Sequence, residues 1–439
     1  MTAEQSMGAG ESKRAPLVSV IMSNFNGADY LEAAVASVLG QSHRTIELIV
    51  ADDASQDDSL AILRRLAASD DRLKLILQEN NTGPAGARNA ALDAARGVWV
   101  AIVDADDLIH PRRIERLLAA AEALEADVVA DDLVSFGSVE MAGRTLLESR
   151  RLAEPLLLTA AELIRSDTVN SGLGSFGYLK PMIRRDALGP LRYDDSLRVG
   201  EDFDLYARLL ICGARFLVLP APLYLYRRHG GSISHRLSVP VLHRLLQAHD
   251  AVAGPAAQGQ PGDSDLASAF RARRAALSRA LRYERLVRAI KTQKGMEVAR
   301  RVVRDPVLLV DLAASLVDRL RRKRSKGAAT GGTEAQTLVL AAPDQVDLIA
   351  APAGAVRCAV SVVDSLLDAD WAKQRSLAST LARLSSQAPP DVIAEGQAGL
   401  EGLGYLPAWR SARLTLDPHT AREAIIPPGV EVEVSAELD

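Results

Sequence analysis

The sequence has few cysteines, few aromatic residues and no long uncharged apolar run, and each shortage excludes a class of protein. Only two of the 439 residues are cysteine, Cys212 and Cys358, too few for the disulfide framework of a small secreted domain. The apolar run at 306–317 contains Asp311 and is shorter than the roughly 20 residues that a membrane-spanning helix needs. The first residues also lack the basic and then apolar pattern of a secretion signal, so we expect a cytoplasmic protein.

The net charge of −4 conceals a basic segment. Residues 270–326 contain 18 Lys/Arg and 5 Asp/Glu, a local balance of +13 that leaves −17 for the rest of the chain. Arginines flank the apolar residues 307–317, which is typical of a helix lying on an anionic membrane surface. A solvated arginine-rich face explains the same pattern, and both alternatives stay open. Nucleic acid is not an expected partner, because aromatic residues are scarce and the chain is acidic elsewhere.

Short apolar runs alternate with segments of helical periodicity in the first part of the chain. They predict four strands, each followed by a helix, at 17–22, 46–51, 73–77 and 98–103. Strands that alternate with helices at this spacing predict an α/β fold with a doubly wound, mostly parallel sheet. In such sheets ligands bind at the carboxyl ends of the strands.

Breaks in composition divide the rest of the chain. Residues 255–262 are rich in Pro, Gly and Gln, and residues 326–333 are compositionally a flexible linker. The sequence therefore predicts five segments, the last a small acidic α/β or α+β domain with no motif that assigns it a role. They are a flexible tail over 1–15, a first domain over 16–254, a basic helical segment over 263–326, a linker over 327–335 and the C-terminal domain over 336–439.

Three predicted strands end in residues suited to a ligand, and these would meet at one edge of the sheet. Asp104 and Asp106 have the spacing to hold Mg²⁺ or Mn²⁺ beside phosphate oxygens, or to form a turn before a helix. Asp53 and its neighbour Asp52 suit a base edge or a ribose, or cap a helix. Phe25 suits stacking on a base, or packing in the core. Together they predict a site for a nucleoside diphosphate.

Four blocks of this region resemble the family 2 glycosyltransferases of GT-A fold. In chain order they are Pro16–Asn26, Ile49–Ser55, Asn81–Asn89 and Val103–Asp107. Their order and spacing match the family over roughly residues 16–236. The resemblance implies a glycosyltransferase of the hexosyltransferase type that takes its sugar from a nucleotide diphosphate sugar, with UDP as the expected nucleotide. Residues 197–236 are similar to bacterial exopolysaccharide enzymes of succinoglycan type, which implies a glycan or lipid-linked oligosaccharide acceptor at the inner face of the membrane.

The resemblance also implies roles for individual residues. Those expected to bind the nucleotide are Phe25, Asn26, Asp53, Arg88 and Asp104. Asp106 is the expected metal ligand, with His229 completing the metal shell or bonding a phosphate.

Residues 201–202 resemble the family's Glu-Asp motif, so Asp202 is the expected general base, although acidic residues also favour the first turn of a helix. Direct displacement with one base predicts inversion at the anomeric carbon. Lys180 lies in a segment similar to related bacterial enzymes, but the resemblance gives it no role.

Processive members of the family carry a Gln-x-x-Arg-Trp motif, which this sequence lacks, so we expect one sugar to be added per visit.

Two alternatives belong to other functional classes. A sugar-1-phosphate nucleotidyltransferase would carry a Gly-rich loop with a Lys after the first strand, and residues 23–27 do not match that pattern. A non-catalytic, nucleotide-sensing scaffold whose C-terminal domain binds a partner stays open, and transfer assays would separate it from an enzyme.

Overall fold

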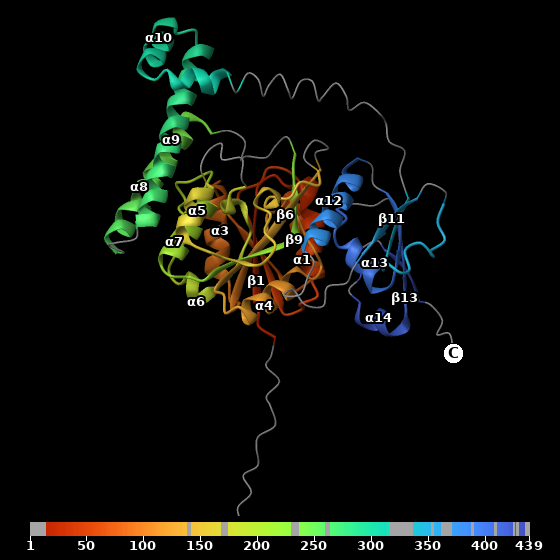
Figure 1. Ribbon diagram of the computed structural model, residues 1–439. Coiled ribbons are helices and arrows are strands. Elements are labelled where there is room, and N and C mark those ends of the chain that lie inside the picture. The colour runs from red at the N-terminus through yellow and green to blue at the C-terminus, as the bar shows by residue number, and fades with distance from the viewer. Residues whose placement is uncertain are drawn as a thin grey trace, which may run out of the picture.

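The computed structural model contains two α/β bodies and a helical stalk (Figure 1). It describes residues 15–137, 142–167, 174–229, 237–259, 264–313, 315, 337–352, 355–360, 371–387, 390–407, 411–424, 426 and 430–434. The predicted linker over 327–335, most of the predicted tail and the basic residues 316–326 lie outside the described residues.

The first body is built on a nine-stranded sheet of strand order β3-β2-β1-β4-β8-β6-β9-β5, with β7 paired to β9. Its strands are β1 Val18–Asn24, β2 Ile46–Asp52, β3 Leu73–Leu77, β4 Trp99–Ile102, β5 Leu108–Ile109, β6 Val128–Phe136, β7 Leu156–Leu158, β8 Met182–Arg184 and β9 Phe216–Arg227. Strands β1 to β4 pair in parallel, and β8 runs antiparallel between β4 and β6. The mostly parallel sheet and its first four strands are therefore confirmed.

Helices follow the strands and bury them. They are α1 Ala28–Leu39, α2 Ser59–Ser69, α3 Gly83–Ala94, α4 Arg113–Ala123, α5 Ala160–Ser166, α6 Arg185–Leu188 and α7 Glu201–Ile211, with 3-10 turns at Glu148–Arg150 and Phe176–Tyr178. All seven residues of β2 are buried. Burial on both faces explains why these strands read as continuous apolar runs rather than as alternating ones.

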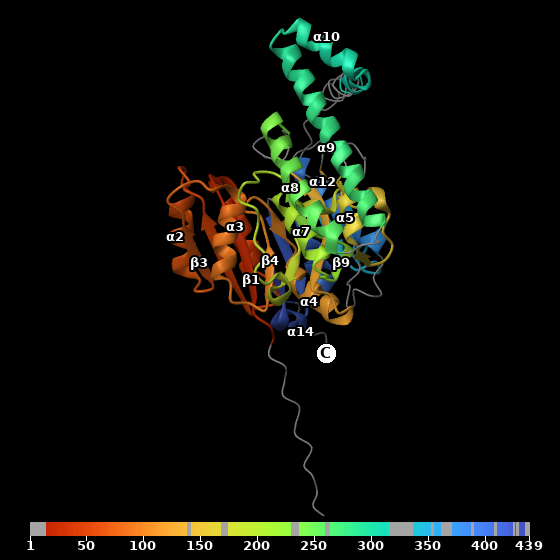
Figure 2. The ribbon, with the colours of Figure 1, turned by 90° about the vertical axis from the view of Figure 1, so that its left-hand side faces the viewer.

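The stalk consists of α8 Val239–Gly259, α9 Ser264–Lys291 and α10 Gly295–Arg304. Helices α8 and α9 lie side by side, α9 packs on α5 and α8 on α7, and the far end of α9 leaves the body and carries α10 (Figures 1 and 2). The predicted break at 255–262 begins inside α8, which continues to Gly259. None of the described helices is long and apolar enough to cross a membrane.

The second body is a five-stranded sheet, parallel throughout, of order β11-β10-β12-β13-β14. Its elements are β10 Thr337–Ala341, β11 Val356–Ala359, α12 Trp371–Gln387, β12 Asp391–Glu395, α13 Gly396–Leu403, β13 Ser411–Leu416, α14 Pro418–Glu423 and β14 Glu431–Val434. Of the two classes predicted for this region, α/β is therefore the observed one.

The two bodies share one apolar core, because α12 packs on β6 and β9 of the first sheet. A buried ion pair joins them as well: Arg116 Nη2 donates to Glu401 Oε1 at 2.6 Å. The ring of His110 also contacts that of Tyr405, with their centroids 4.7 Å apart and their planes tilted by 46°. Gly404 is required at this contact, since a Cβ there would lie 2.4 Å from His110 Nε2.

Candidate active site

The carboxyl ends of the parallel strands bring the predicted site residues to one edge of the first sheet. The register of β1 and β2 places Asn24 beside Asp52, and Asn24 Nδ2 donates to Asp52 Oδ1 at 2.8 Å. The segment 104–107 follows β4 at the same edge, because Ile21 of β1 pairs with Ile102 of β4.

Arg88, on α3, is buried and joins carboxylates from two distant segments. Its Nη2 donates to Asp104 Oδ1 at 2.6 Å, and its Nη1 donates to Glu201 Oε1 at 2.8 Å. The same Nη1 lies 3.3 Å from Asp202 Oδ1. The loop after β4 and the first turn of α7 are therefore held together by one guanidinium.

Lys180 completes a closed ring of charges. Its Nζ lies 2.8 Å from Asp104 Oδ2 and 2.8 Å from Asp202 Oδ2, and the side chain is buried. Burial alone would lower the pKa of Lys180, but the two carboxylates outweigh it and hold this pKa well above its ordinary value. Burial would raise the pKa of Asp104, but Lys180 and Arg88 lower it below its ordinary range. We call Arg88, Asp104, Lys180, Glu201 and Asp202 the charge network.

A glycine allows α7 to begin at the network. Gly200 precedes the helix with φ +84°, a left-handed conformation that L side chains rarely adopt. A Cβ there would also lie 2.7 Å from Leu245 Cδ2 of α8. Residues 201 and 202 thus occupy the first turn of α7, where the helix dipole favours carboxylates.

Residues at the end of β9 hold the loop that contains Asp104 and Asp106 in place through hydrogen bonds. The hydroxyl of Tyr224 donates to Asp107 Oδ2 at 2.8 Å and accepts from the backbone N–H of Asp104 at 3.0 Å. The backbone N–H of Arg227 donates to Asp107 Oδ1 at 2.6 Å. Burial, followed by the charges of Asp106 and Asp104, raises the pKa of Asp107 well above its ordinary value. Asp107 is therefore a buried anchor of the loop.

Asp106 and His229 form a second, more exposed pair. His229 Nε2 lies 2.9 Å from Asp106 Oδ2, although the two residues are 123 positions apart. Oxygen atoms of Asp104, Asp106 and Asp107 lie within 4.8 Å of one another. Oxygen donors with one imidazole fit Mg²⁺ or Mn²⁺, and the side chains of Asp106 and His229 are more exposed than those of Asp104 and the buried Asp107.

The residues predicted to hold the base and ribose lie at the ends of β1 and β2, apart from the charge network. Phe25 is 49% exposed, so its ring is not part of the core. Asn26 has φ +52° and accepts through Oδ1 from the backbone N–H of Gln56 at 2.8 Å. Asp53 accepts from the backbone N–H groups of Thr82 and Gly83 at 2.7 and 2.8 Å, which fixes the start of α3. The capping interpretation of Asp53 thus applies, but to α3 rather than to α2.

Comparison with known proteins agrees with the site described above. The sequence model of the family described as Glycosyl transferase family 2 matches residues 19–175. The succinoglycan biosynthesis protein ExoO of Rhizobium meliloti (strain 1021) is 37% identical over 242 residues, which are 54% of this chain and 68% of that protein. The chain belongs to glycosyltransferase family 2. It is a glycosyltransferase, as the four sequence blocks predict.

Other proteins resemble this family 2 glycosyltransferase over a similar share of the chain. The succinoglycan biosynthesis protein ExoU of Rhizobium meliloti (strain 1021) is 34% identical over 239 residues, which are 54% of this chain and 69% of that protein. The crystal structure of S. aureus TarS 1–349 in complex with UDP-GlcNAc has a TM-score of 0.47 and 20% identity, and the match covers 61% of this chain and 71% of that one.

Sequence reasoning about this family 2 glycosyltransferase missed the part played by two residues. The resemblance gives Lys180 no role, and Tyr224 is not among the predicted site residues, yet the structure places both in contact with the segment 104–107. The one signal for Lys180 in the sequence is the similarity of its segment to related bacterial enzymes, because the three-residue strand β8 that brings it beside β4 leaves no periodic pattern. Residues 224–234 resemble the loop that closes the site in many members of the family, and residues 230–234 of it lie outside the described residues.

Proposed function

We propose that this enzyme is an inverting, metal-dependent, non-processive glycosyltransferase that moves a sugar from a UDP-sugar to a hydroxyl of a glycan or lipid-linked acceptor. The observation that carries the proposal is the charge network beside the pair Asp106 and His229. It brings the expected base and the expected metal-binding loop together from segments 98 residues apart, counted from Asp104 to Asp202.

The donor side of the proposal uses the ends of the first two strands. The exposed ring of Phe25 offers a face on which the base stacks. Asn26 and Asp53 border the same edge, and each keeps lone pairs that its protein partners leave available to a ribose or a base edge. Arg88 and Asp104 mark the point at which the diphosphate would meet the charge network.

Asp106 and His229 would hold Mg²⁺ or Mn²⁺, with Asp104 in support. When bound, the ion supplies positive charge that stabilises the departing nucleotide diphosphate. The chain adds its own cations at this point: Arg227 lies beside the loop, with its Nε donating to the carbonyl of Asp106 at 2.6 Å. Stabilising charge that develops as the nucleotide leaves is the electrostatic form of catalysis.

Asp202 would act as the general base. Its carboxylate accepts the proton of the acceptor hydroxyl while that oxygen attacks the anomeric carbon from the side opposite the nucleotide, and the configuration inverts. In the structure Lys180 and Arg88 occupy its two oxygens. The acceptor hydroxyl therefore takes the place of one of these cations, and the other holds the carboxylate in position.

The names of the relatives favour a role in bacterial surface-polysaccharide synthesis, because ExoO and ExoU are succinoglycan biosynthesis proteins. We place the enzyme on the cytoplasmic side of the membrane, in peripheral contact with it. The transferase domain is proposed to cover residues 16–254.

Two substitutions test the proposal with a panel of UDP-, GDP- and dTDP-sugars. Asp202→Asn should lower transfer by about 10²–10⁴-fold, the usual contribution of a general base, while nucleotide binding stays near wild type. Asp106→Ala should remove the Mn²⁺-dependent thermal shift produced by the nucleotide. The exposed residues Asp195 and Asp71 provide matched controls, as Asp195→Asn and Asp71→Ala. Transfer by Asp202→Asn at the wild-type rate would exclude this residue as the base.

A further inference from the structure

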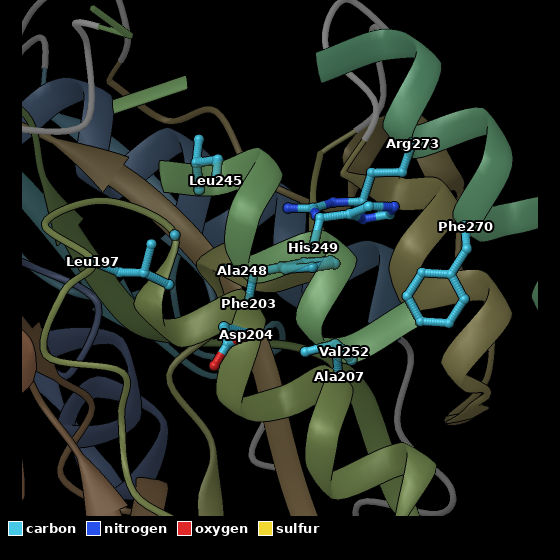
Figure 3. Close-up of a pocket in the computed structure, with 11 residues that line it drawn as sticks. Leu197, Phe203, Asp204, Ala207, Leu245, Ala248, His249, Val252, Phe270 and Arg273 are labelled. Carbon is cyan, nitrogen blue, oxygen red and sulfur yellow. The ribbon is translucent and has the colours of Figure 1, made fainter. Parts of the chain in front are cut away.

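The stalk packs against α7, the helix whose first turn contains the expected base Asp202. Arg273 of α9 lies against α7, with its guanidinium carbon 3.9 Å from the ring centroid of Phe203 (Figure 3). The same guanidinium donates to Asp167 Oδ2 at 2.7 and 3.0 Å and lies 3.1 Å from His249 Nδ1. Buried contacts of this kind hold the stalk in one orientation relative to the active site.

The far end of the stalk is a small cap of helix that folds back on α9. We call residues 295–313, which comprise α10 and the helical residues 307–313, the tip. Leu308 is buried, and two ion pairs fasten the tip to α9. Asp305 pairs with Arg282 at 2.8 Å, and Asp311 pairs with Arg279 at 2.6 Å.

The acidic residues of the tip form ion pairs with arginines of α9 and α10, and other arginines of α10 are exposed. Besides Asp305 and Asp311, the only acidic residue between 295 and 313 is Glu297, which pairs with Arg301. Arg300 and Arg304 are exposed and have no ion pair with any described residue. The outer side is therefore positively charged although the whole chain carries −4.

Large apolar side chains are exposed among these arginines. Met296 is 89% exposed, Val303 80% and Val310 65%. Within α10, positions 296, 300, 303 and 304 are spaced by four, seven and eight residues from the first and so share one side of the helix. Single exposed apolar residues are common on proteins, but a cluster of them on one face marks an interaction surface. We call these four residues of α10, together with the exposed Val310 of the helical residues that follow, the outer face.

The outer face and the active site lie toward the same end of the molecule. Strand β1 starts near the bottom of Figure 1 and runs upward. The carboxyl ends of the strands parallel to it therefore lie toward the top, where α10 lies. A planar surface that met the tip would therefore face the edge of the sheet that carries the site.

We propose that the outer face docks on an anionic lipid bilayer. Met296, Val303 and Val310 would enter the boundary between headgroups and acyl chains, and Arg300 and Arg304 would bond the lipid phosphates. A bilayer fits better than a protein groove, because exposed apolar and basic side chains are interleaved on α10 and each acidic group of the tip is held in an ion pair. The proposal names the surface for the peripheral contact but does not rest on the sugar-transfer chemistry.

Flotation of the full-length protein with lipid vesicles tests this. The wild type should float with vesicles rich in phosphatidylglycerol and much less with phosphatidylcholine alone, and added salt should weaken the binding. Arg300→Glu with Arg304→Glu should weaken binding to the anionic vesicles by about 30-fold or more, given the usual contribution of two basic residues at such a surface. Met296→Ser with Val303→Ser should weaken it by about tenfold or more.

Each double variant has a matched control elsewhere in the chain. Arg64→Glu with Arg185→Glu makes the same change of charge at exposed sites on α2 and α6, with α6 at the opposite end of the molecule from the tip (Figure 1). Leu348→Ser with Val98→Ser removes exposed apolar side chains away from the tip. Both controls should float as the wild type does, and thermal melting should show that every variant is folded.

Three results would overturn the proposal. The first is equal binding of the wild type to neutral and anionic vesicles, and the second is an equal loss in the tip variants and their controls. The third is a wild type that is dimeric without lipid and becomes monomeric in the tip variants, which would make a second copy of the chain the occupant. Hydrolysis of the donor in lipid-free solution should be unchanged in the tip variants, so a failure of the transferase proposal is seen separately.

Discussion

Both sheets of this chain bring the carboxyl ends of parallel strands to one edge, but the two edges carry different side chains. The second sheet has strand order β11-β10-β12-β13-β14, an order in which doubly wound sheets bind ligands where the order reverses, here between β10 and β12. At this edge the described residues offer two acidic side chains, those of the exposed Asp344, which follows β10, and of Glu395, the last residue of β12. The first sheet has at its carboxyl edge two buried cations and three carboxylates in mutual contact.

The charge network distinguishes the edge of the first sheet from that of the second, and the fold alone does not require it. Parallel strands bring their carboxyl ends together in either sheet, but a buried charge is costly unless it is paired. A sheet has no need of such charges for its own stability, because apolar residues of similar size often serve as well. The charge network of the first sheet is thus the part of the molecule that packing alone does not explain, and function is argued from it rather than from the fold.

Replacing Lys180 should have the largest effect on activity, and it tests whether the charge network sets the first sheet apart from the second. Lys180→Met leaves Asp104 and Asp202 with Arg88 as their one cation in a buried site, so the carboxylates repel each other and move apart. We expect kcat/KM for transfer to fall by about 100-fold or more, as when one electrostatic donor is removed from an active site. Steady-state kinetics on the purified variant provide the measurement.

Two further variants interpret that result. Lys180→Arg keeps the charge and should recover part of the activity, which a general folding defect would not allow. The exposed Lys373 on α12 belongs to the second body, and Lys373→Met should stay within about twofold of wild type, as surface changes usually do. Wild-type kinetics in Lys180→Met would show that the charge network is no more functional than the edge of the second sheet.

The buried pair between the two bodies should give the next largest effect, on stability. Glu401→Gln leaves Arg116 buried without its carboxylate partner, and a broken buried pair typically costs about 3–5 kcal/mol. The midpoint of urea denaturation should fall accordingly. Glu395→Gln, in the same body but outside any ion pair between described residues, should change stability by no more than about 0.5 kcal/mol. Equal midpoints for the two variants would mean that the buried pair of Arg116 and Glu401 adds no measurable stability to the contact between the bodies.

His110 should make the same contact sensitive to acid. Burial, followed by the opposing effects of Glu401 and Arg116, lowers the pKa of His110 from 6.5 to about 4 in the folded chain. The unfolded chain therefore binds a proton that the folded chain does not, and the stability contributed above pH 6.5 is lost as the pH falls toward 4. The loss should reach about 2–3 kcal/mol near pH 4.5.

Denaturation midpoints measured across that pH range check this expectation. His110→Gln should show a shallower loss of stability between pH 6.5 and 4.5 than the wild type, whatever its stability at neutral pH. The exposed His419 of the second body is the control, and His419→Gln should keep the wild-type pH dependence. A loss of equal slope in all three proteins would assign the acid sensitivity to other groups.

The sequence predicted local features well and contacts between distant segments poorly. Strands buried on both faces leave continuous apolar runs, so β1 to β4 and the polar residues that follow them could be found. Lys180 could not be given a role, because its contact with Asp104 depends on a three-residue strand, β8, that lies beside β4 without any periodic signal. The contact of His110 with Glu401 spans 291 positions, and no local pattern predicts such a pair.

The smallest expected effect is at the carboxyl edge of the second sheet, where Asp344→Asn combined with Glu395→Gln should leave transfer and the nucleotide-induced thermal shift within about twofold of wild type. Neither side chain has an ion pair among the described residues, and Asp344 is exposed. An exposed carboxylate in water keeps its charge without a partner, so it is no sign of a ligand. If the double variant instead lost the response to nucleotide, the second sheet would hold a ligand where its strand order reverses, and the two sheets would differ in degree rather than in kind.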